Sequence, residues 1–97
     1  MKKPIKEIQI VPVKPNNGLV AFCSFTLFDS LYCGSIGVFT RPAGGYRLVY
    51  PTKLTGNREM NIFHPISKQI GQHIEQEVIK KLEEVMKDDR YSSSDNL

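Results

Sequence analysis

An apolar stripe with helical spacing occurs close to the end of this sequence. Its members recur every four positions: Ile70, Ile74, Val78, Leu82 and Met86. Side chains spaced in this way lie on one face of an α-helix. Ser67 stands just before the stripe, where its hydroxyl can cap the first turn. The stripe predicts one C-terminal helix, and it leaves the rest of the chain to form strands and turns.

The first 66 residues predict strands. Segments rich in β-branched, aromatic or alternating apolar residues are separated there by Asn, Gly, Asp or Pro. We expect strands over residues 5–13, 19–28, 31–39 and 46–50, and a polar, basic loop over 52–61. These patterns predict an α+β domain, with a small antiparallel sheet of about four to five strands and one C-terminal helix packed on it.

Residues 19–28 carry apolar side chains on both faces of the expected strand. Odd-numbered positions hold leucine, alanine, cysteine and phenylalanine, and even-numbered positions hold valine and phenylalanine. Such a strand is typical of a sheet that is covered on both sides. One helix cannot cover both faces, so we expect a homodimer formed through the sheet. Pairing between the copies is expected near residues 34–39, where Gly34 and Gly37 permit close approach.

The length of 97 residues allows one domain, which we expect over residues 1–90. Residues 91–97 are rich in serine, and we expect a polar disordered tail there. Hydrophobic residues make up 40% and charged residues 24% of the chain, which excludes a disordered composition. The most apolar segment, residues 18–28, is too short to span a bilayer. We therefore expect a cytoplasmic protein with no membrane partner.

Cys23 and Cys33 do not form a disulfide framework, and we expect two reduced, buried thiols. If Asp29 and Ser30 form a two-residue hairpin loop, opposed residues have numbers of opposite parity. The two cysteines would then point to opposite faces of the sheet. A three-residue loop would reverse this arrangement.

The sequence has no recognisable catalytic constellation. A cysteine paired with His64 is the one enzymatic alternative, but both cysteines fall within expected strands, where a thiol is buried and unreactive. No spacing of Cys and His suggests a metal site, and the glycine pairs lack the lysine of a phosphate loop. We expect a non-enzymatic protein with no cofactor, no metal and no small-molecule substrate.

Basic residues are concentrated in the strand-forming part of the chain. Residues 1–66 carry eight basic and three acidic side chains, whereas residues 67–97 carry five basic and seven acidic ones. Basic groups with nearby aromatic rings can hold a phosphate backbone and stack bases. The candidates for nucleic-acid contact are Arg41, Arg47, Lys53, Arg58, Tyr46 and Tyr50. The alternative interpretation is a solvated sheet edge whose charges discourage aggregation.

The order of two motifs resembles a known family. The strand ending in Leu48-Val49-Tyr50-Pro51-Thr52-Lys53 is followed by a short polar loop, by Phe63-His64-Pro65-Ile66 and by the helix. This arrangement, over about residues 5–86, resembles the bacterial stage V sporulation protein G family, also called septation protein SpoVG. The chain departs from the family at residues 34–38, where Gly-Ser-Ile-Gly-Val replaces a polar, basic run.

The resemblance implies a small sheet with a packed helix, a homodimer, and binding of DNA and RNA by a regulator of septation and sporulation. Lys53 is the candidate that matches the family motif best, and Arg58 matches after a loop shift. The leading hypothesis is a nucleic-acid-binding regulator. The alternative is a protein-interaction module of the same fold that does not bind nucleic acid.

Overall fold

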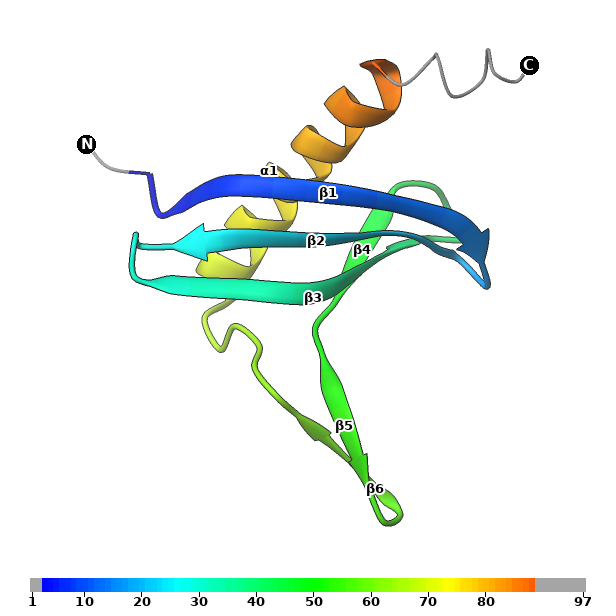
Figure 1. Cartoon of the computed structure of the whole chain (residues 1–97), viewed down its shortest axis with the longest axis vertical. Helices are drawn as coiled ribbons and strands as arrows, with labels where there is room; N and C mark the ends of the chain where they lie inside the picture. The colour runs from blue at the N-terminus through cyan, green and yellow to red at the C-terminus, as the bar shows by residue number, and fades with distance from the viewer. Residues whose placement is uncertain (1–2, 89–97) are drawn as a thin grey trace.

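A computed structural model of the chain describes residues 3–88. A four-stranded antiparallel sheet, a separate two-stranded hairpin and one C-terminal helix make up the fold (Figure 1), which confirms the α+β class. The expected tail at residues 91–97 lies outside the described residues. In chain order the elements are β1 (Ile5–Asn16), β2 (Leu19–Leu27), β3 (Leu31–Thr40), β4 (Tyr46–Val49), β5 (Thr52–Thr55), β6 (Arg58–Asn61) and α1 (Lys68–Asp88).

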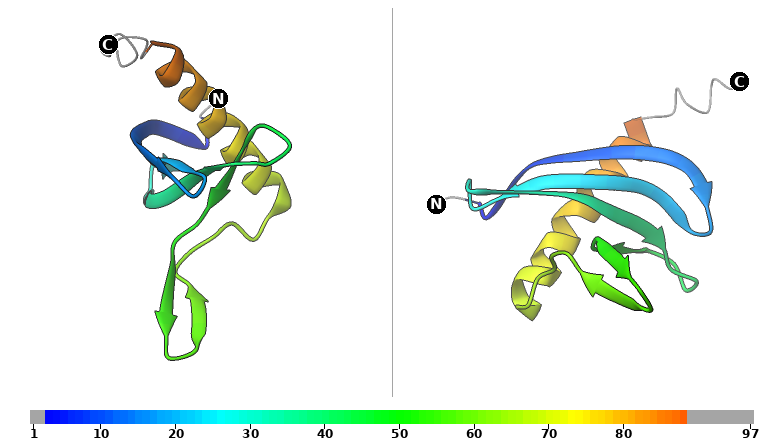
Figure 2. Two further views of the ribbon diagram at one scale, coloured as in Figure 1. Left: turned by 90° about the vertical axis from the view of Figure 1, so that its right-hand side faces the viewer. Right: turned by 60° about the horizontal axis from the view of Figure 1, so that its bottom comes forward.

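The main sheet has the order β1-β2-β3-β4, and α1 crosses one of its faces obliquely (Figure 2). Alternate residues of β2 and β3 point toward the helix, because successive side chains of a strand face opposite ways. The helix contributes three residues of its predicted stripe to the same core. The fully buried members include Ala21, Phe25, Ile36, Val38, Val78 and Leu82. Burial of this shared apolar surface holds α1 on the sheet.

The helix begins as its sequence predicts. The hydroxyl of Ser67 accepts a hydrogen bond from the backbone N–H of Ile70 at 3.2 Å. The carbonyl of Ser67 accepts the bond from the N–H of Gly71 at 2.9 Å, which is the first turn of the helix. Ser67 is therefore the N-cap, and it satisfies a backbone donor that the helix itself leaves without a partner.

The opposite face of the sheet is open within this chain, so cover of β2 on its second face by another copy stays a prediction. Phe22 on β2 is 41% exposed and Tyr32 on β3 is 71% exposed. In the part of the chain that the structure describes, α1 is the only helix, and it lies on the other face. A single helix supplies one apolar stripe, which covers one side of the sheet.

The turn between β2 and β3 has three residues, so the predicted two-residue loop is wrong. Leu27 pairs with Leu31, which leaves Phe28, Asp29 and Ser30 in the turn. Phe28 and Asp29 both have left-handed backbone angles, with φ of 53° and 55°. The sequence pattern predicts that Phe28 belongs to the strand, because a phenylalanine rarely adopts a left-handed backbone conformation in a turn.

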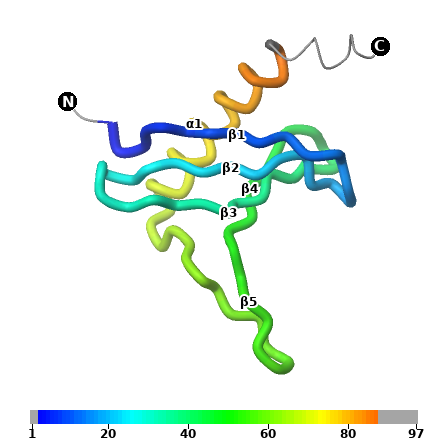
Figure 3. Tube along the Cα trace, viewed as in Figure 1, coloured from blue at the N-terminus to red at the C-terminus, as the bar shows by residue number. Residues whose placement is uncertain are grey.

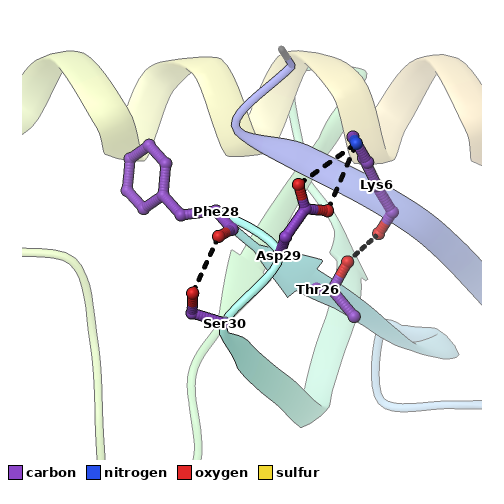
Figure 4. A network of polar contacts seen from close by, with 5 residues as sticks. All are labelled: Lys6, Thr26, Phe28, Asp29 and Ser30. Atoms are coloured by element: carbon purple, nitrogen blue, oxygen red, sulfur yellow. Dashed lines mark hydrogen bonds and ion pairs between the residues drawn. The ribbon is translucent and has the colours of Figure 1, made fainter.

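This turn is tied to β1 by polar contacts (Figure 4). The Nζ atom of Lys6 lies 3.2 Å from both carboxylate oxygens of Asp29. The hydroxyl of Ser30 donates to the carbonyl of Phe28 at 2.9 Å, and the hydroxyl of Thr26 donates to the carbonyl of Lys6 at 3.2 Å. These contacts stabilise the left-handed turn and hold it against β1.

The longer turn reverses the expected placement of the cysteines. Cys33 is paired with Phe25, and Cys23 is paired with Ile36. Opposed residues of an antiparallel pair share a face, so both thiols lie on the helix side, where both cysteines are buried and free. The register shifts between the two pairs, next to Ser35, whose φ of 58° marks an irregularity in β3. The prediction that the thiols face opposite sides is wrong.

Residues 52–61 form a β-hairpin, so the predicted loop is wrong as well. β5 and β6 pair along their whole length around Gly56 and Asn57. Gly56 has a φ of 63°, which glycine adopts without strain. The hairpin projects away from the main sheet, and the Cα trace follows the chain out along β5 and back toward α1 (Figure 3). We call this hairpin the arm.

Candidate nucleic-acid interface

The candidate residues on β4 lie on opposite sides of the main sheet. Arg47 is paired with Phe39, and its guanidinium carbon lies 5.2 Å from the centre of that ring. Arg47 is exposed on the open face. Tyr46 and Tyr50 instead pack against the core on the helix side. Side chains alternate along β4 and on to Tyr50, and this alternation separates the cation from the tyrosines.

Arg41 is engaged by its neighbours. Its Nε donates a hydrogen bond to the carbonyl of Tyr46 at 2.9 Å. Its Nη2 lies 3.6 Å from the Oε2 atom of Glu75 on α1, in an ion pair whose side chains are partly exposed. The acidic partner reduces the positive field that Arg41 can offer to a phosphate.

Tyr50 is held within the protein. Its ring meets that of Phe63 edge to face, with centroids 5.9 Å apart and planes at 76°. The hydroxyl is buried and has no hydrogen-bond partner among the described residues. This burial raises the pKa of Tyr50 to about 12, and the nearby Cys23, Cys33 and Glu75 add to the shift. A ring packed in this way cannot also stack on a base.

Lys53 and Arg58 are brought together on the arm. Lys53 pairs with Met60, and Thr55 pairs with Arg58. Alternation along each strand therefore puts these four side chains on one face of the hairpin, which we call the cationic face. Both cations are exposed, and neither has an ion pair within residues 3–88.

The other face of the arm carries its internal hydrogen bond and an exposed leucine. The hydroxyl of Thr52 donates to the Oε2 atom of Glu59 at 2.8 Å. Leu54 on this face is 72% exposed, and Met60 on the cationic face is exposed as well. Ile62 and Ile66, which follow the arm in the chain, are also exposed. The arm therefore presents charge and uncovered apolar surface together, a combination that is common at binding surfaces.

Sequence reasoning missed the exposed aromatic residues of the open face. Phe22 and Tyr32 line a hollow of about 380 Å³ on that face. The sequence contains a signal for this apolar face, because the expected strand over residues 19–28 carries apolar side chains at even-numbered positions, on the face away from the helix. The pattern predicts a covered face, because a second copy is expected there.

Within the described residues, the two thiols do not have the properties of a nucleophile. Burial raises the pKa of Cys23 to about 12 and raises that of Cys33 as well, whereas a nucleophilic cysteine needs a lowered pKa. Within residues 3–88, no group of three or more His, Cys, Asp or Glu side chains is placed to hold a metal ion. In the same range, no helix is long and apolar enough to cross a membrane.

A scan against protein-family models finds no match to the chain, and a search of curated proteins finds none either. The resemblance to the stage V sporulation protein G family stays a prediction from the motifs around Lys53 and His64.

Proposed function

We propose that this protein is a non-enzymatic regulator that binds nucleic acid through the cationic face of the arm. The observation that carries the proposal is the placement of Lys53 and Arg58 on one exposed face, with no acidic partner in the described part of the chain. Lysine and arginine bind phosphates through charge and hydrogen bonds and need no base sequence to do so. The resemblance to SpoVG adds the expectation of a cytoplasmic regulator of septation or sporulation.

The proposal includes a homodimer, because one copy offers few cations. An isolated two-stranded hairpin is marginally stable, and the exposed apolar residues of the arm would gain from a partner surface. β4 pairs only with residues 37–40 of β3, so residues 31–36 have β2 alone as a neighbour among the described strands. This free edge moves the expected pairing between copies from residues 34–39 to residues 31–36.

The test is a titration of labelled, mixed-sequence DNA and RNA at low salt. The variant Lys53→Ala/Arg58→Ala is compared with Lys14→Ala/Lys80→Ala, which removes two exposed charges from outside the arm. Neutralising about three phosphates gives a log–log salt slope of roughly −2 to −3 for the wild type. Loss of both arm contacts should weaken binding to all sequences and reduce that slope by about two. The control variant should bind like the wild type.

Unchanged affinity in the arm variant, with circular dichroism showing a folded protein, would place the site elsewhere. A monomeric mass by light scattering would contradict the homodimer.

A second candidate function is a protein-interaction module, and the exposed apolar residues of the arm favour it. Leu54 and Met60 lie on opposite faces of the hairpin and are both uncovered. A partner that encloses the arm would bury both faces. Failure of the wild type to bind DNA or RNA at low salt would favour this candidate over the first.

A further inference from the structure

Two aromatic rings share the open face of the main sheet. Phe22 is paired with Val11 on β1, and Tyr32 is paired with Thr26 on β2. Phe22 and Thr26 are separated by an even number of positions on β2, so their side chains point the same way. The residues between them, such as Phe25, are buried on the helix side. Phe22 and Tyr32 therefore both face away from α1.

The ring of Tyr32 lies close over the backbone of β3. A Cβ atom built on Gly34 would fall 2.9 Å from the Cε2 atom of Tyr32 and 3.0 Å from its hydroxyl oxygen. Any other residue at position 34 would push the ring away from this position. Glycine thus allows the ring to lie along the strand, although Tyr32 as a whole stays largely exposed.

The hollow beside these rings is lined by groups that can recognise a base. Besides Val11 and the two aromatic residues, its lining includes Gln9, Ser24 and Ser35. The amide of Gln9 and the two hydroxyls can each donate and accept hydrogen bonds. The side chains that line the hollow include no carboxylate that would repel a phosphate.

A cation stands on the same face. Phe22 is paired with Gly37, and Phe39 lies two residues further along β3, so its ring also faces outward. The guanidinium of Arg47 sits over that ring while remaining exposed. An arginine held by a ring keeps its N–H donors directed at solvent, where a phosphate can accept them.

We propose that the open face of the main sheet binds unpaired bases of single-stranded nucleic acid, with Phe22 and Tyr32 as the stacking rings. The proposal rests on the nucleic-acid function above. It adds that the nucleic acid is single-stranded and that the protein contacts it through a second surface. Rings on a sheet can stack only with bases that have left a duplex, because paired bases already stack on each other. Arg47 holds the backbone, and Gln9, Ser24 and Ser35 contact base edges.

The competing occupant is the face of a second copy, which would bury the same apolar rings. The surface of the hollow is mostly apolar, as the flat face of a base requires. The polar side chains of Gln9, Ser24 and Ser35 at its border and the exposed guanidinium of Arg47 on the same face favour a nucleic-acid strand over an apolar protein surface. Pairing between copies along residues 31–36 of β3 uses the sheet edge, and it leaves this face free.

The experiment compares a labelled single-stranded oligonucleotide with the duplex of the same sequence. Phe22→Leu/Tyr32→Leu removes both rings but keeps apolar side chains, and Phe22→Tyr/Tyr32→Phe keeps both rings. Phe28→Leu is the matched control, since Phe28 is an exposed ring in the β2–β3 turn. We expect the wild type to prefer the single strand. The leucine variant should lose about 5- to 150-fold in single-strand affinity per ring. The ring-retaining variant and the Phe28 control should keep wild-type affinity.

The salt slope separates this proposal from the one for the arm. The rings contact no phosphate, so the leucine variant should weaken binding with an unchanged slope, whereas the arm variant lowers the slope. Full single-strand affinity in a folded leucine variant would overturn the proposal that Phe22 and Tyr32 stack on bases, and it would leave the arm proposal intact. If the leucine variant becomes a monomer and its affinity for the single strand is unchanged, the open face is the contact between two copies, and the proposal that its rings stack on bases is overturned. A wild type that binds neither oligonucleotide would overturn both proposals.

Discussion

The same kind of apolar residue is buried in the main sheet with α1 and exposed in the projecting arm. Leu82 on α1 is 0% exposed, whereas Leu54 on β5 is 72% exposed. Both stand in regular secondary structure. The difference is that α1 faces a sheet and β5 faces solvent (Figure 1). Periodicity creates an apolar face, but an opposing element is needed to bury it.

The largest expected effect comes from truncating these two leucines. Leu82→Ala should lower the free energy of unfolding by about 2–5 kcal/mol, because it removes packed atoms and leaves a cavity. Leu54→Ala makes the same chemical change on the arm and should cost less than about 0.5 kcal/mol. Urea denaturation followed by circular dichroism measures both. Equal losses would mean that Leu54 is buried against another surface in solution.

Alkaline pH should destabilise the main body and leave the arm unaffected. Burial raises the pKa of Cys23 to about 12 in the folded chain, whereas an unfolded cysteine ionises near pH 8.5. Below that lower pKa both states are protonated and this stabilising contribution is complete. As the pH rises toward 12, the unfolded state alone loses its proton, so stability falls.

Urea denaturation at several pH values between about 8 and 11 measures this loss. Cys23→Ala should reduce the pH dependence and leave the part that comes from the buried Cys33 and from the buried hydroxyl of Tyr50, whereas Leu54→Ala should leave it unchanged. A stability that stays constant over the range would show that the thiol is not buried in solution.

A smaller effect is expected where the chain returns from the arm to the helix. Ser67→Ala removes the hydroxyl that accepts a bond from the N–H of Ile70, and it should cost about 1 kcal/mol. Ser67→Asp keeps an acceptor at the same place and should retain most of the stability. The denaturation midpoint reports both changes. A midpoint that is the same for alanine and aspartate would mean that the cap contributes nothing.

The smallest global effect should come from the hydrogen bond within the arm. Thr52→Val removes the donor to Glu59 but keeps a β-branched side chain. We expect less than about 0.5 kcal/mol of global destabilisation, because the arm opens separately from the body. Amide hydrogen exchange should become faster in β5 and β6 and stay slow in β2. Faster exchange in both regions would show that the arm and the body unfold together.

Local pattern was sufficient for the elements that hold the core. The four-residue spacing from Ile70 and the hydroxyl of Ser67 predict α1 and its cap. The alternation of Tyr46 and Arg47 predicts which side of β4 each residue takes. These features depend on residues that are close together in the sequence, within a turn or two of helix or within one strand. The local sequence is therefore enough to predict them.

Turn length could not be predicted from the same information. Phe28 adopts a left-handed conformation that its residue type disfavours, and contacts of the turn with Lys6 stabilise it. One additional residue in the turn moved both cysteines to the same face. Composition likewise favoured a loop at residues 52–61, where the arm forms.

The sequence by itself determined the α+β class, the single C-terminal helix and the set of basic residues. Tertiary structure alone decided which candidates act together. Pairing of β5 with β6 joined Lys53 to Arg58, contact with Glu75 engaged Arg41, and packing on Phe63 enclosed Tyr50. The physical reason is the distance along the chain over which each kind of interaction acts. Periodicity and caps are set by residues a few positions apart, whereas exposure and charge pairing depend on surfaces that meet only when distant segments pack.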